Sequence, residues 1–166
     1  MTGVTRTIAL LAAAGCAGCS GKSDATLAAT DAAIVSSDGA DVTCGRNATP
    51  FVLPVSARTP NDEFTATLTA SEPPKFGMGD NAWTLRIDGA DGKPAAGLVF
   101  NVVPWMTEHK HGAVKTVIVT EVGDGVYEAK PINVNMPGIW DIRVEFPGGD
   151  GGTPLRAVFS FCSSAR

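Results

Sequence analysis

Apolar and polar residues alternate with a period of two along most of the chain beyond residue 63. The alternation is strictest in residues 140–146, where large apolar residues take turns with charged ones, and residues 64–68 and 83–88 repeat it. Successive side chains of a β-strand point to opposite faces of the sheet. The period therefore predicts strands that are buried on one face and exposed to water on the other.

Four less regular apolar runs extend the pattern, at residues 98–103, 117–120, 126–132 and 155–161. Turn sequences such as Asp91-Gly92, Asp124-Gly125 and Pro137-Gly138 separate the runs. No helical pattern competes with them. We therefore expect one all-β domain of about seven short strands, folded as an immunoglobulin-like β-sandwich.

The positions that keep phase with the alternation predict the core of this sandwich. We expect the following side chains to be buried: Leu68, Trp83, Leu85, Ile87, Trp140, Ile142, Val144 and Phe159.

Residues 1–15 are typical of a bacterial lipoprotein signal peptide. Arg6 is their only charge, and the apolar stretch at residues 8–14 is too short to span a bilayer. Small residues lead directly into a cysteine twice, so Cys16 and Cys19 are both candidates for lipidation. Cys16 follows the more regular motif, whereas Cys19 follows a longer apolar stretch. We expect a protein of the cell envelope, in the periplasm or on the outer surface, anchored to the membrane by lipid.

Residues 16–43 are mostly small and polar, which predicts a flexible tether. The folded domain is expected at residues 44–166, beginning with an irregular, proline-containing stretch at residues 50–62. Cys44 and Cys162 bracket this domain, and an oxidising compartment favours a disulfide between them. The alternatives are two free thiols, or a Cys162 that binds metal.

The charge and the motifs exclude several classes of function. The formal net charge is −4 and no basic run occurs, so nucleic acid is not an expected partner. The chain contains neither a G-x-S-x-G nor an H-E-x-x-H motif. The glycine-rich residues 148–152 lack the lysine of a phosphate-binding loop. We therefore expect a protein that is not an enzyme.

Both histidines of the chain, His109 and His111, lie in one loop between Met106 and Met136. Imidazole nitrogens and thioether sulfurs are the donors that copper selects. In a locally extended loop both histidines point to the same side. We hypothesise that these four residues bind one copper ion, with Met78 as a less favoured ligand. The alternative is a non-catalytic interaction module, in which this loop contacts a partner without metal.

Several short motifs, taken in order, resemble the YtkA-like domain, which is related to the FixH family. They include Pro104-Trp105-Met106, His109-Lys110-His111-Gly112 and Met136-Pro137-Gly138-Ile139-Trp140, and the resemblance covers roughly residues 64–162. It implies an immunoglobulin-like sandwich outside a bacterial membrane.

FixH-type proteins are linked to copper supply for haem–copper oxidases. The resemblance therefore also implies a partner that receives copper or assists oxidase assembly. The chain departs from the family in one respect. The family often has Met-Pro followed by His-Gly-His, whereas Thr107 follows Met106 here and Lys110 separates the histidines.

Overall fold

The computed structural model of the protein describes residues 44, 48–148 and 151–164. The expected signal peptide (1–15) and tether (16–43), with Cys16 and Cys19, lie outside the described residues. Within the described part the chain forms nine strands and no α-helix. The strands are β1 (Val55–Arg58), β2 (Phe64–Glu72), β3 (Gly79–Gly89), β4 (Asn101–Met106), β5 (His111–Gly112), β6 (Ile118–Gly123), β7 (Val126–Val134), β8 (Gly138–Phe146) and β9 (Leu155–Ser163).

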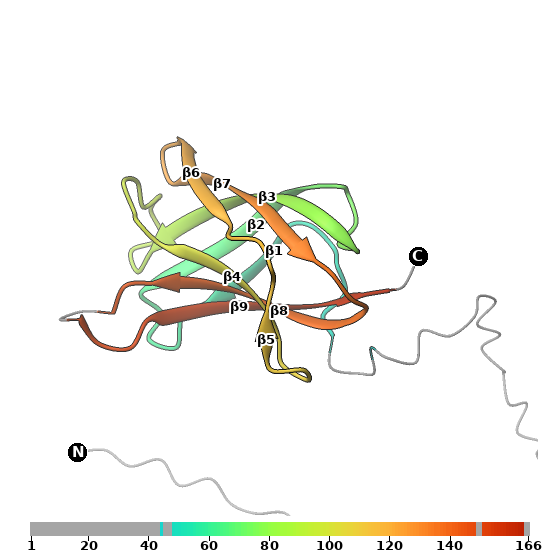
Figure 1. The fold of residues 1–166 in the computed structure, drawn as a ribbon. Helices are drawn as coiled ribbons and strands as arrows, with labels where there is room; N and C mark the ends of the chain where they lie inside the picture. Colours follow the sequence, from blue (N-terminus) through green and yellow to red (C-terminus); the bar gives the residue numbers. More distant parts are fainter. Residues whose placement is uncertain (1–43, 45–47, 149–150, 165–166) are drawn as a thin grey trace, which may run out of the picture. The chain divides into compact units, whose positions relative to one another are not determined.

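The strands form two antiparallel sheets that pack as a sandwich (Figure 1). One sheet has the order β1-β2-β3-β7-β6 and the other the order β5-β4-β8-β9. The predicted all-β sandwich is thus confirmed, and each of the seven predicted runs overlaps a strand, although residues 98–103 share only their second half with β4. The two additional strands are β1, inside the proline-containing stretch, and β5, which has only two residues. A segment of two or four residues is too short to show a period in the sequence. Such a segment forms a strand only because it pairs with a neighbouring strand.

The core lies between the sheets, where the sequence places it. All the side chains predicted to be buried are at most 3% exposed. The indole ring of Trp83 on β3 meets the rings of Phe159 and Phe161 on β9 edge-on, each at 5.8 Å between centroids. Full burial of one large apolar side chain stabilises a fold by about 1.5–3 kcal/mol, so these contacts join the sheets firmly.

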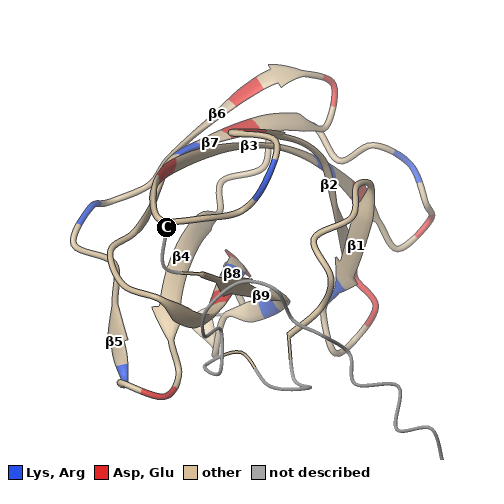
Figure 2. Ribbon diagram, turned by 90° about the vertical axis from the view of Figure 1, so that its right-hand side faces the viewer, with Lys and Arg blue, Asp and Glu red and all other residues tan. Residues whose placement is uncertain are grey.

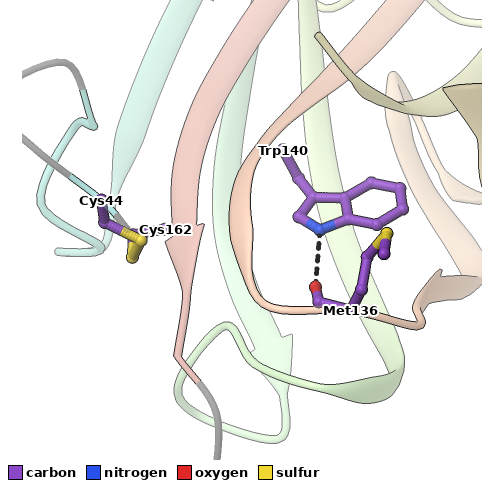
Figure 3. The surroundings of a disulfide bond; sticks show 4 residues. All are labelled: Cys44, Met136, Trp140 and Cys162. Carbon is purple, nitrogen blue, oxygen red and sulfur yellow. Dashed lines mark hydrogen bonds between the residues drawn. A yellow bond between two sulfur atoms is a disulfide. The ribbon is translucent and has the colours of Figure 1, made fainter. Parts of the chain in front are cut away.

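A disulfide between Cys44 and Cys162 ties the start of the domain to the last strand (Figure 3). The two Cα atoms are 5.6 Å apart, which is a usual separation for a disulfide. The Thr49 amide also donates to the Ser160 carbonyl of β9 at 2.8 Å. Two bonds of different kinds therefore hold the N-terminal end of the described domain against β9.

The charged residues are scattered over several strands and loops, with basic and acidic side chains intermixed (Figure 2). Among the described residues, no helix is long and apolar enough to cross a membrane.

Candidate metal site

The two histidines are presented by a tight hairpin between β4 and β5. Met106 and His111 are directly opposite each other in this antiparallel pair, and residues 107–110 form the loop between them. Lys110 turns the chain with a left-handed φ of 56°. Side chains that face each other across an antiparallel pair lie on the same face of the sheet. His111 is therefore on the same, inward face as the buried Met106.

The His111 ring meets a sulfur that comes from a distant segment. Met136 lies in the turn between β7 and β8, and its Sδ is 3.3 Å from His111 Nε2. His111 Nδ1 is 3.0 Å from the carbonyl oxygen of Gly112. A carbonyl only accepts hydrogen bonds, so this contact favours the tautomer in which Nδ1 carries the hydrogen. In that tautomer the lone pair of Nε2 faces the thioether, so two atoms of types that can bind a metal lie side by side.

Trp140 holds the Met136 turn from inside the core. Its Nε1 donates to the Met136 carbonyl at 3.0 Å, and the Met136 thioether lies alongside its indole ring (Figure 3). The His111 ring stands edge-on to the same indole, at 6.1 Å between centroids. Trp140 is fully buried, and a buried indole N–H normally needs an acceptor. The same bond that satisfies Trp140 thus fixes the backbone of Met136.

The candidate ligands differ in how deeply their side chains are buried. His109 is exposed, and its ring centroid is 5.9 Å from that of His111. His111 and Met136 are half-buried, whereas Met106 is only 1% exposed and belongs to the core. Met78 is half-buried and packs against the hydrophobic core. The fold thus places His111 against Met136, with His109 beside His111 and with Met106 across the hairpin from it.

A profile of the YtkA-like family matches residues 59–145, which is more than half of the chain. The chain belongs to the YtkA-like family. The match includes the histidine hairpin, the Met136 turn and Trp140. No curated protein and no solved structure matches the chain.

The residue types near the hairpin limit the ligands that a metal could find in this YtkA-like domain. Among the described residues, no three His, Cys, Asp or Glu side chains are grouped so that they could hold a metal ion. Any metal at the hairpin would therefore need methionine beside the two imidazoles. Trp105, a further aromatic residue at the hairpin, lies under the guanidinium of Arg143 at 4.8 Å. The Trp105 ring therefore already stacks against a cation of the protein, the Arg143 guanidinium.

Sequence reasoning missed two residues that shape the site. Trp140 was expected in the core, but nothing in the pattern indicated its bond to the Met136 carbonyl. Asp141 is one of the charged residues in the alternating stretch 140–146, and its carboxylate accepts a hydrogen bond from Thr107 at the start of the histidine loop. Thr107 and Asp141 are 34 residues apart, and Trp140 bonds from a strand to a residue of the preceding turn. The period of a single strand contains no information about either hydrogen bond.

Proposed function

We propose that this YtkA-like protein is exported, anchored to the membrane by an N-terminal lipid, and holds or hands over copper outside the inner membrane. The observation that carries the copper proposal is the 3.3 Å approach of His111 Nε2 to Met136 Sδ. Neither atom is a good donor to the other when Nδ1 carries the hydrogen, so a soft cation would satisfy both.

The chemistry of the four side chains suits Cu(I). Two imidazoles and one or two thioethers form a soft, mostly neutral donor set, and Cu(I) prefers such ligands. The Gly112 carbonyl supports His111 in the way that outer hydrogen-bond acceptors commonly orient metal-binding imidazoles. The residues present therefore fit copper, with His109, His111 and Met136 as the accessible ligands and Met106 beneath them.

The gradient of exposure supports exchange with a partner. His109 is exposed, His111 and Met136 are half-buried, and Met106 is buried. A metal ion would therefore reach and leave the site past His109, which a docking protein can contact. We propose a copper-receiving protein or an oxidase assembly factor as this partner.

The test is a Cu(I) titration of the full chain, in competition with a chromophoric Cu(I) chelator and without thiol reductants. Cys16 and Cys19 are replaced by serine in every sample, because free thiols there would bind Cu(I) themselves. We expect one equivalent of Cu(I) to bind, and binding to be abolished in a variant that combines His109→Ala with His111→Ala. Met136→Leu, which keeps the bulk and removes the sulfur, should weaken binding strongly.

Circular dichroism of each variant controls for unfolding. Equal affinity of the wild-type chain and the double histidine variant would refute the copper proposal. Protons compete with metal for imidazole nitrogens, so binding should also weaken in mildly acidic buffer.

A second candidate function is a non-catalytic interaction module. A groove of about 320 Å³ lies between β4 and the connection that follows β5, lined by residues 101–104, 112–113 and 115–117. Val114 and Ile118, next to its lining residues, are 77% and 66% exposed. Apolar side chains exposed beside a groove favour contact with another protein. If the chain takes up no copper, the interaction module becomes the better supported function.

A further inference from the structure

Two consecutive residues of β8 hold the two segments that carry the metal donors. Trp140 points into the core and donates to the Met136 carbonyl at 3.0 Å. Asp141 points to the opposite face of the sheet, where its Oδ2 accepts a hydrogen bond of 2.7 Å from Thr107 Oγ1. Thr107 is the first residue after β4 and opens the loop that contains His109. One short piece of β8 therefore contacts both donor segments.

The carboxylate of Asp141 is itself held in place. Its Oδ1 accepts a hydrogen bond of 2.6 Å from Ser160 Oγ on β9, directly opposite Asp141 in the sheet. The guanidinium of Arg143, on the same face of β8, is 3.9 Å from Oδ2 and is fixed in turn over the Trp105 ring. The Asp141 side chain is only 21% exposed. It presents a fixed, oriented acceptor to Thr107.

Within the described residues, no other side chain of loop residues 107–110 bonds to the rest of the domain. Of these four residues, all of which the structure describes, Thr107 alone makes a side-chain hydrogen bond or ion pair, and it makes it to Asp141. A hollow of about 240 Å³ lies beside this bond, lined by Thr107, Glu108, Ile139, Asp141 and Ser160. Without the bond, the loop would have room to move toward the outer face, away from Met136.

We propose that Asp141 is a positioning residue, which keeps the histidine loop in register with Met136 through its hydrogen bond to Thr107. The inference rests on the proposed copper site, because the role given to Asp141 is to keep the imidazoles and the thioether close together. Asp141 faces away from the donors and takes no part in binding the ion. Its effect is to lower the cost of ordering the loop when copper binds.

The test uses a matched pair of substitutions at Thr107 in the full chain that carries Cys16→Ser and Cys19→Ser. Thr107→Val has nearly the same shape but no hydroxyl, whereas Thr107→Ser keeps the hydroxyl. Asp141→Ala and Ser160→Ala remove the acceptor and its support. Cu(I) affinity is measured by chelator competition. In the metal-free protein, nuclear Overhauser contacts between the His111 ring and the Met136 methyl group report the loop position, and amide hydrogen exchange reports its order.

We expect Thr107→Val and Asp141→Ala to weaken Cu(I) binding roughly 10-fold to 100-fold, as is usual for partners that orient metal ligands. Both should also weaken the His111–Met136 contact and speed exchange of the His111 amide in the metal-free protein. Thr107→Ser should behave as wild type, and Ser160→Ala should lie between.

The outcomes separate the two proposals. If the wild-type chain binds no Cu(I), the copper proposal fails, while the metal-free measurements still decide whether Asp141 positions the loop. If Thr107→Val matches wild type in the metal-free measurements, the positioning proposal is wrong. It is equally wrong if Thr107→Val and Thr107→Ser lose binding to the same extent.

Discussion

The terminal methyl group of Met106 occupies the space that a β-carbon at position 138 would need. Gly138 is the first residue of β8, and its φ of +130° is a backbone conformation that L side chains rarely adopt. A glycine at this point therefore allows β8 to begin directly against Met106, in the turn that also carries Met136. The burial of the Met106 side chain and the backbone path of the Met136 turn therefore depend on each other.

Gly138→Ala should accordingly destabilise the domain and disturb the site. The unfavourable φ alone costs about 1–3 kcal/mol, and the clash with Met106 adds to this. We expect a corresponding fall in the free energy of unfolding, measured by urea denaturation. Gly77→Ala is the matched control, because a β-carbon there meets nothing within 4 Å and the φ is not positive. Equal stability of the two variants would contradict the assigned role of Gly138.

Removal of the disulfide should lower the stability of the domain strongly. Cys44 and Cys162 are 118 residues apart, and the loop-entropy relation gives about 4–5 kcal/mol for a loop of this length. We expect a double variant, Cys44→Ala with Cys162→Ala, to lose about this much in urea denaturation. The reduced wild-type protein should unfold at the same urea concentration as the variant. A thiol assay on the unfolded, unreduced chain should find neither cysteine free.

An ion pair links the connection after β5 to the other sheet and makes a small part of the stability depend on pH. Asp80 Oδ2 accepts from Lys115 Nζ at 2.6 Å and its Oδ1 from Asn133 Nδ2 at 2.6 Å. The hydrogen bonds from Lys115 and then from Asn133 lower the pKa of Asp80 below its ordinary value of 3.8. A carboxyl whose pKa is lower in the folded state stabilises the fold above its unfolded pKa.

That contribution should disappear as the pH falls from about 3.8 through the lowered pKa of Asp80. In Lys115→Met the pKa of Asp80 should move back toward its ordinary value, because the first cause of the shift is gone. Nuclear magnetic resonance titration of the Asp80 carboxyl carbon measures this directly. Because the pair is well exposed, the effect on overall stability at neutral pH should be small. An unchanged titration curve in Lys115→Met would show that Lys115 does not cause the shift.

Lipid attachment predicts a specific fractionation behaviour. The wild-type protein should remain in the membrane fraction until detergent is added. Replacement of the lipidated cysteine should release it, and comparison of Cys16→Ser with Cys19→Ser identifies the site, for which we expect Cys16. Mass spectrometry of the N-terminal peptide should show the lipid. Release of the wild-type protein by salt alone would argue against an anchor.

The sequence by itself determined the class of fold and the core. Period-two alternation is a local property, and it tells which side chains of a strand share a face. For this reason Trp83, Trp140 and their in-phase neighbours were placed correctly. The same logic gave seven of the nine strands but not β1 or β5, since a strand of two or four residues exists only through its partner.

The sequence also drew attention to the histidines and methionines, but only the tertiary structure decided how they meet. His111 and Met136 are 25 residues apart, and Thr107 and Asp141 are 34 apart. Strand register and turn geometry bring such pairs together, and neither is encoded in a local pattern. Periodicity could say that Met106 lies near a loop. The pairing of β4 with β5, and the glycine at the start of β8, decided that it lies in the core across from His111.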